Sequence, residues 1–173
     1  MPKSLADGRT KFTVLTTEPA NPAAPTAAEL NAGLDLSCNV LSSDFTWGAT
    51  DSDKVAEAAL CDTNNANALG KSNYQAGITV FRYFDDTTGA PDATEDVAFE
   101  AVKAKGTRLW GYIRRNGKLA SAAWATGDEI PCGMEIIADT PQPPSDMGGY
   151  IKYRSPLEPQ KGWDFIEVGP VTP

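Results

Sequence analysis

Apolar and polar residues alternate in several short segments of the chain, as they do in strands that bury one face. The segment Lys11-Phe-Thr-Val-Leu-Thr-Thr17 has this period of two and predicts a half-buried strand. Further strands are predicted at 34–41, 44–50, 74–84, 107–115, 132–140, 149–153 and 163–168. Residues 54–62 are ambiguous, because their alanines suit a helix while their alternation favours an extended segment, and we predict a strand there.

A helix is predicted between two of these strands, at residues 93–105. Asp92 and Glu95 have the spacing of a capping box, and Gly106 is well placed as a C-cap. An apolar stripe along the helix would face the sheet, and it consists of Val97, Ala98, Ala101 and Val102. The sequence therefore predicts a strand, an acidic turn at 85–91, a helix and a second strand.

The strand before this helix is apolar on both faces. Ile78, Val80 and Phe84 would line one face, while Phe81 and Tyr83 would line the other. A strand of this kind is central in a sheet, or it is buried by a neighbouring subunit as well as by its own core.

The regions between the strands set the domain organisation. Three prolines between 18 and 25 cannot continue a sheet interior, so residues 1–25 are expected to form an N-terminal arm. Thr26 and Glu29 have capping-box spacing and predict a short helical turn, and the Asn-rich stretch 62–73 predicts a surface loop. Residues 26–173 are expected to form a single β-rich domain with a sandwich-like or barrel-like core and one flanking helix.

Composition narrows the function. The chain has 173 residues, a formal charge of −8 and a pI of about 4.5. This charge argues against binding nucleic acid through its phosphates and against docking on an anionic membrane. No apolar run is long enough to cross a bilayer, and the polar N-terminus does not have the apolar core of a signal peptide. A protein made and kept, or assembled, in a cytoplasm is expected.

Catalytic and metal-binding signals are weak. The chain contains no histidine, which removes the Ser-His-Asp and Cys-His nucleophilic schemes. Its three cysteines, Cys38, Cys61 and Cys132, include no CxxC pair. Buried core positions are expected for them, with a Cys38–Cys61 disulfide as the alternative. The sequence predicts no enzyme, no cofactor and no metal.

Two acidic clusters and a basic cluster remain. Asp85-Asp86 and Glu95-Asp96 are read as a solvated turn and a charged helix start. Asp51-Ser-Asp53 resembles the start of a calcium loop, but the required Gly and distal Glu are not at the right spacing. Arg114, Arg115 and Lys118 predict a basic hairpin tip. That tip would be a plain soluble turn, a contact to an acidic partner or a second copy, or a nucleic-acid contact.

The order of local patterns resembles that of a known family. The patterns are Asp51-Ser-Asp-Lys-Val-Ala-Glu-Ala-Ala-Leu-Cys61, then Ser72-Asn-Tyr-Gln-Ala-Gly-Ile-Thr-Val-Phe-Arg-Tyr-Phe84, the capped helix, and Arg108-Leu-Trp-Gly-Tyr-Ile-Arg-Arg115. They are similar to those of the major tail protein (tail tube protein) of long-tailed, siphovirus-type phages of actinobacteria. The resemblance covers residues 10–170.

The resemblance implies a structural virion protein of the phage tail, assembled in the host cytoplasm. It implies hexameric rings whose inner strands join into one β-barrel and which stack into a tube. The implied partners are further copies of the chain, a tape measure protein in the lumen, and tail terminator and distal tail proteins at the ends. Genomic DNA would pass through without specific binding, and no membrane would be involved.

Under this reading, the strands at 37–50, 74–84 and 107–115 would be luminal or ring-closing, and the helix would lie outside them. The residues expected at subunit interfaces are Phe81, Tyr83, Phe99, Trp110, Tyr112, Arg114 and Arg115. No long hairpin that would link rings is evident, so the segments 16–36 and 42–54 are candidates for that role. The alternative function is a monomeric, immunoglobulin-like binding or decoration module, and a small enzyme is a third.

Overall fold

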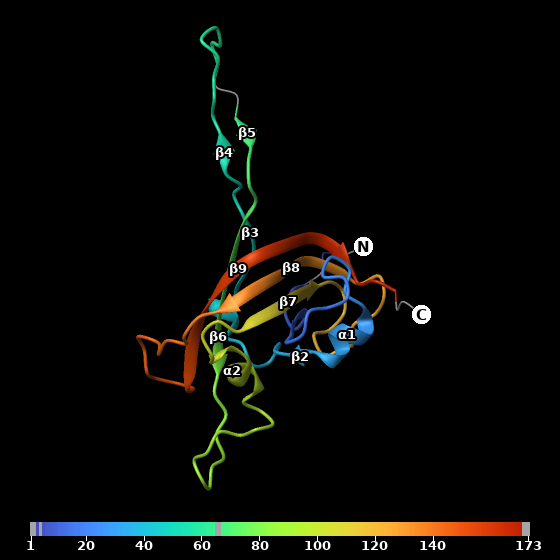
Figure 1. Cartoon of the computed structure of the whole chain (residues 1–173). Coiled ribbons are helices and arrows are strands. Elements are labelled where there is room, and N and C mark those ends of the chain that lie inside the picture. Colours follow the sequence, from blue (N-terminus) through green and yellow to red (C-terminus); the bar gives the residue numbers. More distant parts are fainter. Residues whose placement is uncertain (1–2, 4, 65–66, 171–173) are drawn as a thin grey trace.

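A seven-stranded antiparallel sheet organises the protein, with the strand order β2-β1-β7-β8-β9-β6-β3 (Figure 1). The computed structural model describes residues 3, 5–64 and 67–170. The strands of the sheet are β1 (Thr10–Leu15), β2 (Leu34–Asp35), β3 (Thr46–Thr50), β6 (Asn73–Phe81), β7 (Arg108–Arg115), β8 (Glu129–Ala138) and β9 (Lys152–Glu167). The mainly-β prediction is therefore confirmed.

The remaining elements are short. They are α1 (Ala27–Ala32), the 3-10 helix η1 (Ser42–Asp44), β4 (Lys54–Val55), β5 (Ala68–Leu69) and α2 (Val97–Val102). Parts of three predictions lie outside the described residues: positions 1, 2 and 4 of the arm, 65 and 66 of the loop, and 171–173 of the domain.

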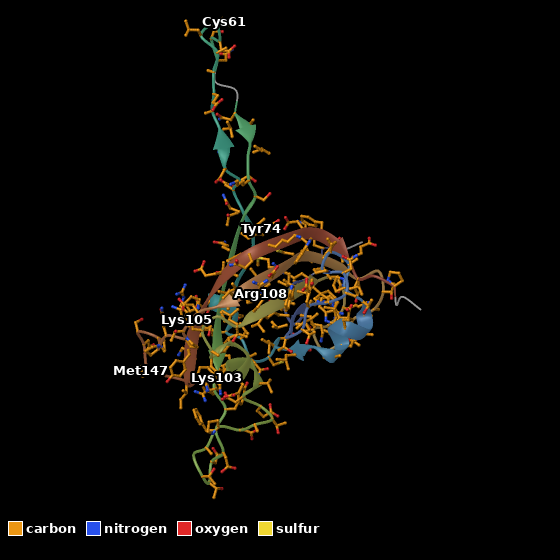
Figure 2. All side chains as sticks on the ribbon, in the orientation of Figure 1. Cys61, Tyr74, Lys103, Lys105, Arg108 and Met147 are labelled. Atoms are coloured by element: carbon orange, nitrogen blue, oxygen red, sulfur yellow. The ribbon has the colours of Figure 1, made fainter. Side chains whose placement is uncertain are left out.

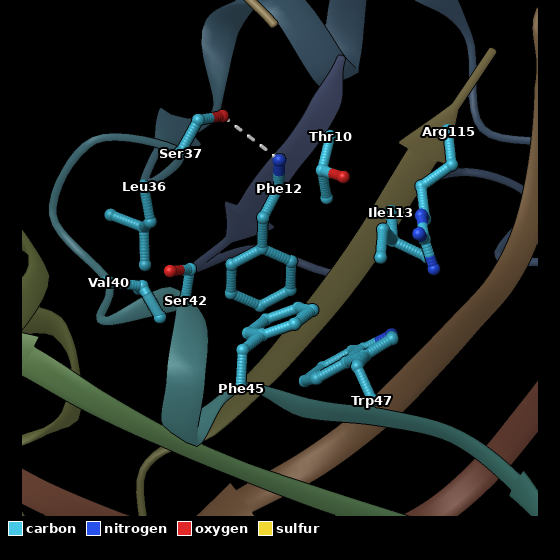
Figure 3. Close-up of a pocket in the computed structure, with 10 residues that line it drawn as sticks. All are labelled: Thr10, Phe12, Leu36, Ser37, Val40, Ser42, Phe45, Trp47, Ile113 and Arg115. Carbon is cyan, nitrogen blue, oxygen red and sulfur yellow. Dashed lines mark hydrogen bonds between the residues drawn. The ribbon is translucent and has the colours of Figure 1, made fainter. Parts of the chain in front are cut away.

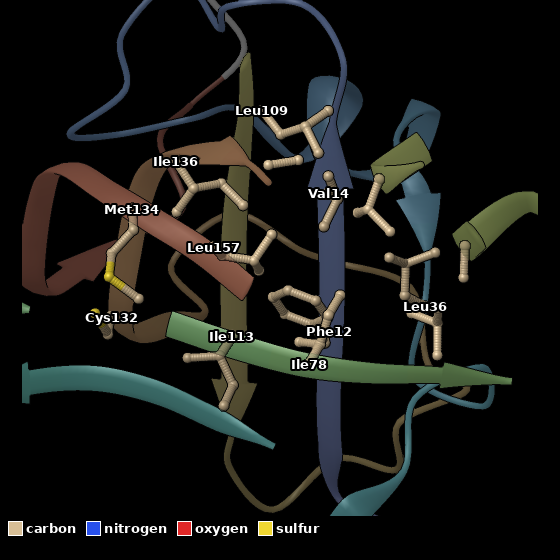
Figure 4. Close-up of a cluster of buried hydrophobic side chains, with 14 residues drawn as sticks. Phe12, Val14, Leu36, Ile78, Leu109, Ile113, Cys132, Met134, Ile136 and Leu157 are labelled. Atoms are coloured by element: carbon tan, nitrogen blue, oxygen red, sulfur yellow. The ribbon is translucent and has the colours of Figure 1, made fainter. Parts of the chain in front are cut away.

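The middle strands of the sheet bury both of their faces. Leu109 and Ile113 of β7 point into one apolar cluster, together with residues of β1, β6, β8 and α2 (Figure 4). Trp110 and Tyr112, on the opposite face of β7, belong to a second cluster with Leu30 of α1 and other residues. Because both faces are covered, β7 reads in the sequence as a nearly continuous apolar run.

The predicted helix at 93–105 is shorter in the structure, where α2 spans Val97–Val102. Asp92 does cap a turn, since its Oδ1 accepts hydrogen bonds from the backbone N–H groups of Thr94 (2.8 Å) and Glu95 (3.0 Å). The Asp96 carboxylate is drawn instead into an ion pair with Arg82. At the other end the N–H of Gly106 donates to the sheet, 2.8 Å from the Ala138 carbonyl oxygen, so the helix stops early.

Other predicted boundaries also shifted. The strands predicted at 149–153 and 163–168 are one long strand, β9, with a register shift opposite Glu135 and Ile136. The strand predicted at 34–41 shrinks to Leu34–Asp35. The tight hairpin expected at 114–118 is wrong, because residues 116–128 form a longer connection before β8 begins.

The N-terminal region is part of the folded unit rather than a free arm. Strand β1 lies between β2 and β7, and its Phe12 and Val14 are core residues. The following segment packs on the sheet, since the Tyr112 hydroxyl donates to the Pro22 carbonyl oxygen at 3.1 Å. The capping box of Thr26 and Glu29 at α1 is confirmed. A domain boundary at residue 25 therefore divides one continuous core.

The most prominent departure from the predictions is a long hairpin that leaves the sheet. Strands β3 and β6 pair from Thr46–Gly77 to Thr50–Asn73, and the two chains continue beyond the sheet to the short pair β4–β5. We call residues 51–64 and 67–72 the projecting hairpin (Figure 1). The sequence suggested a strand at 54–62 and a surface loop at 62–73, and it did not indicate that the two would run together away from the body.

Candidate assembly surfaces

The projecting hairpin receives almost no cover from its own chain. Every described residue in it is exposed except Ser52, which is half-buried. Three of its apolar side chains are largely in solvent: Val55 is 46% exposed, Leu60 110% and Leu69 80%. A two-stranded ribbon with no hydrophobic face against a core is marginally stable on its own. The hairpin therefore gains little stability from its own chain, and its apolar side chains are available for contact with another surface.

Hydrogen bonds fix the direction in which the hairpin leaves the sheet. The Asn73 side-chain amide donates to the Asp51 carbonyl oxygen at 3.1 Å and to Asp53 Oδ1 at 2.9 Å. One step further, the N–H of Gly70 lies 2.7 Å from the Asp53 carbonyl oxygen. The base of the hairpin thus continues the β3–β6 ladder, and Cys61 lies at the tip (Figure 2). Leu60 lies in the same turn, which the N–H of Asp62 closes on the Ala59 carbonyl oxygen at 2.9 Å.

A second exposed apolar surface lies at the other end of β6. Its cavity has a volume of about 610 Å³, and its lining residues are Cys38, Phe81, Arg82, Tyr83, Phe84, Asp86, Gly149, Tyr150 and Ile151. We call it the β6–β9 groove, because the end of β6 and the residues before β9 form it. Tyr150 is 82% exposed and Ile151 57%. The Tyr150 ring also meets the Phe81 ring edge-on, with centroids 5.9 Å apart.

A buried ion pair makes the floor of this groove rigid. Arg82 Nε lies 3.0 Å from both carboxylate oxygens of Asp96, whose side chain is fully buried. The guanidinium also stacks over the Phe99 ring, 3.8 Å from its centroid. Burial, with the charges of Glu95, Cys38 and Asp96, raises the pKa of Tyr83, so its hydroxyl is neutral at physiological pH.

The predicted basic tip is not a unit in the structure. Arg114 is fully buried, and its guanidinium donates to the carbonyl oxygens of Leu119, Ala122 and Ala123, each at 2.9 Å. It also lies 3.1 Å from Asp128 Oδ2. Arg115, one residue later, is exposed. Arg114 therefore holds the 116–128 connection against the sheet, and of the two arginines only Arg115 faces outward.

Asp128 is the acidic centre of that connection. Burial acts to raise its pKa, but hydrogen bonds from Lys118 and the Ala125 N–H and the charges of Lys118 and Arg114 outweigh it. The net effect lowers the pKa below the usual value for aspartate.

The residues predicted at subunit interfaces fall into two groups. Trp110, Tyr112 and Arg114 are buried in their own chain, where burial also raises the pKa of Tyr112. Phe81, Tyr83 and Phe99 are half-buried and lie together at the β6–β9 groove and the adjacent α2, and Arg115 is exposed elsewhere. The prediction did not include Leu60, Tyr150 and Ile151, whose side chains are exposed in the structure. The signal available in the sequence was that these apolar residues lie in otherwise polar connecting segments.

The two ends of the sheet face one another across an aromatic seam. Phe12 of β1, Phe45 just after η1 and Trp47 of β3 pack edge-on or stacked, and with Thr10 and Arg115 they line a pocket of about 320 Å³ (Figure 3). Trp47 also covers Gly111 of β7. The sheet is therefore curled, and β3 presents an outer edge to which no described strand is paired.

The structure offers little for chemistry. Among residues 3, 5–64 and 67–170, there is no cluster of three or more His, Cys, Asp or Glu side chains that could hold a metal ion. Burial raises the pKa of Cys132 to about 12, so its thiol is neutral. The core prediction was right for Cys132 and wrong for Cys38 and Cys61, which are exposed free thiols. Within the described part of the chain, no helix is long and apolar enough to span a membrane.

Comparison with known proteins gives one clear result. A family model described as phage tail tube protein matches residues 1–170. A comparison with curated proteins finds no match.

Proposed function

Because the chain belongs to the phage tail tube protein family, it is a structural component of the virion tail that assembles with itself into a tube, and we propose how its surfaces carry out that assembly. Six copies form a ring, rings stack, and genomic DNA passes through the stack during delivery. The tail is that of a long-tailed, siphovirus-type phage of actinobacteria, assembled in the host cytoplasm. A tape measure protein fills the lumen during assembly, and tail terminator and distal tail proteins close the ends.

The observation that carries this proposal is the projecting hairpin. It leaves the body with its backbone paired and its apolar side chains in solvent. A closed monomer gains nothing from exposing Leu60 and Leu69 on a ribbon. In a stacked assembly the same ribbon reaches the next ring. The hairpin therefore takes the ring-linking role for which 16–36 and 42–54 were candidates, since much of 16–36 packs on its own sheet.

Ring closure uses the sheet edges. Among the described strands none pairs with the outer edge of β3, and at the opposite edge β2 is only Leu34–Asp35. Pairing between the edges of adjacent copies would extend each curled sheet into a continuous barrel. The strands in 37–50 and 74–84 are the luminal or ring-closing ones in this scheme, and α2 lies outside them.

The acidic composition suits a conduit for DNA. Six copies at −8 each amount to −48 formal charges per ring. A lumen with this sign of charge would repel phosphates and let DNA pass without specific binding.

Hairpin shortening tests the proposal. Replacing residues 52–71 by a two-residue Asn-Gly turn should leave the β3–β6 ladder and the core intact, so the far-ultraviolet circular dichroism of the body and its thermal unfolding should persist. The full chain should give hollow tubes by negative-stain microscopy, and the shortened chain should stop at single rings or monomers. Tubes from the shortened chain would rule out the linking role.

The competing function is a monomeric, immunoglobulin-like binding module. Size-exclusion chromatography of the full chain at high concentration, with and without added tube fragments as seeds, separates the two. A strictly monomeric species under both conditions would refute assembly.

A further inference from the structure

We propose that the β6–β9 groove is the receptor for the projecting hairpin of a second copy of this chain in the adjacent ring. The inference rests on the proposed function and specifies which surface of one subunit meets which surface of the next. Leu60 at the hairpin tip would seat between Tyr150, Ile151 and Phe84.

The symmetry of a tube determines the kind of contact between its rings. A tube that grows by repeated addition along its axis needs a head-to-tail contact made from two different patches on opposite ends of the subunit. The projecting hairpin supplies one patch. The other must be exposed, apolar and at the far end of the body.

The positions of the two surfaces fit this contact. Strand β6 begins at the hairpin base, near Tyr74, and ends at Phe81 in the groove. At about 3.3 Å per residue, β6 separates the two surfaces by about 27 Å, and the hairpin extends about a further 33 Å from Thr50 to Leu60. Figure 2 shows Cys61 at the top of the molecule, and Met147, close to the groove residues in sequence, at the lower left of the body. One axis of the subunit thus runs from hairpin tip to groove.

The composition of the two surfaces also fits this contact. Of the ten large apolar side chains that are exposed in the described residues, seven lie on these two surfaces, and the other three are Leu5, Leu119 and Phe165. The hairpin carries Val55, Leu60 and Leu69, and the groove and its approach carry Phe84, Met147, Tyr150 and Ile151. The hairpin offers twenty described residues, nearly all exposed, which matches the roughly 20–30 residues that each partner contributes to a stable interface.

Contacts within one subunit hold the β6–β9 groove in place. Arg82 is fixed by Asp96 and by Phe99, so the groove exists before anything binds in it. With the receptor already formed, the entropy cost of ordering the contact falls on the hairpin alone.

The chain's own thiols provide the test. Cys61 is at the hairpin tip and Cys38 lines the groove, and both are exposed, whereas Cys132 is buried. In assembled tubes Cys61 of one copy would lie beside Cys38 of the next. A short bismaleimide adds each thiol across one of its double bonds without any oxidant, and it should join copies into a ladder of multimers on a denaturing gel.

Single cysteine substitutions show which two thiols are cross-linked. Tubes of Cys38→Ser alone, or of Cys61→Ser alone, should yield no cross-linked species. Tubes grown from a mixture of the two variants should yield dimers and nothing larger. Each chain then has only one of the two exposed thiols, so each cross-link joins one chain of each kind and neither can be linked again. The Cys132→Ser variant should give the same ladder as the unchanged chain.

Two further readouts use the unchanged thiols and the apolar anchor. Assembly should slow maleimide labelling of Cys38 at least tenfold relative to the dilute monomer. Leu60→Ser or Tyr150→Ser should raise the concentration of unassembled subunits about tenfold, since each removes an apolar group from the contact. Leu119→Ser, at an exposed position away from both surfaces, is the matched control and should leave this concentration unchanged.

The outcomes separate this inference from the proposed function. Three outcomes would place the hairpin elsewhere but would not contradict tube formation. They are tubes that give no ladder, tubes of either single-cysteine variant that do give one, and tubes in which Cys38 stays fully reactive. Joining within dilute monomers would assign the groove to the hairpin of the same copy and overturn the inference. Failure of the unchanged chain to form tubes would overturn the proposed function and this inference with it.

Discussion

Arg114 allows the sharpest test of the physical reasoning, because its neighbour Arg115 is a natural control. The Arg114→Met substitution keeps much of the side-chain volume and removes the charge. It leaves the carbonyl oxygens of Leu119, Ala122 and Ala123 without their donor and takes one cation from Asp128. The aliphatic replacement also loses the stacking of the guanidinium on Trp124, 5.1 Å from the ring centroid.

The expected cost follows from burial. Removing one partner of a buried, hydrogen-bonded ion pair costs about 3–5 kcal/mol, because the groups left behind cannot return to water. For a domain whose total stability is about 5–15 kcal/mol, this is a large fraction. A change of this size should lower the melting temperature by roughly 6–20 °C for a chain of this length.

The assay is urea unfolding followed by tryptophan fluorescence, at concentrations at which the chain is monomeric, so that assembly does not add to the stability. Arg115→Met should change the free energy of unfolding by less than about 0.5 kcal/mol, since Arg115 is exposed. Arg114→Lys should fall in between, because one ammonium group cannot reach all the acceptors of the guanidinium. A cost below about 1 kcal/mol for Arg114→Met would refute the reasoning.

Two more predictions concern packing and pH. Gly111→Ala would drive a Cβ into the Trp47 ring and should lower the free energy of unfolding by about 1–3 kcal/mol, measured by thermal unfolding. Gly48→Ala, with nothing within 4 Å of the new Cβ, should lower it far less. Equal losses of stability would contradict the close packing of β3 on β7. The pKa of Asp128 is lowered in the folded state, so its ionised form stabilises the fold above the unfolded value of about 4, and this contribution is lost as the pH falls through the folded pKa. Asp128→Asn should therefore be less stable than the unchanged chain at pH 6 and should lose less stability between pH 5 and pH 2; parallel pH profiles would count against the shift.

The sequence predicted the fold best where a pattern has a local cause. The period of two in residues 11–17 and the capping box at Thr26 act over a few residues, and both elements form. The half-buried character predicted for the strand is wrong, because Lys11 and Thr13 are buried as well as Phe12 and Val14. The apolar run at 107–115 predicted a strand, and its burial on both faces comes from its own chain.

The misses have non-local causes. A cap at Asp92 predicted a longer helix, but Asp96 forms an ion pair with Arg82, which lies just after β6, and the helix begins only after Asp96. Two adjacent arginines look alike in sequence, yet strand alternation sends Arg114 inward and Arg115 outward. The projecting hairpin has neither a tight turn signal nor a continuous alternation, because no core dictates its residues.

That lack of a core has a kinetic consequence. A ribbon without buried side chains has little local stability, so its ordering is deferred until it meets a surface that covers it. The conformational entropy that the hairpin loses on ordering is large compared with the few contacts between two free subunits. In the proposed tube it is offset only when a complete ring edge covers the hairpin. Spontaneous initiation should then be slow, and elongation from an existing end fast. If the hairpin links rings as proposed, a subunit of this design should stay largely dispersed until a template or a high concentration starts polymerisation.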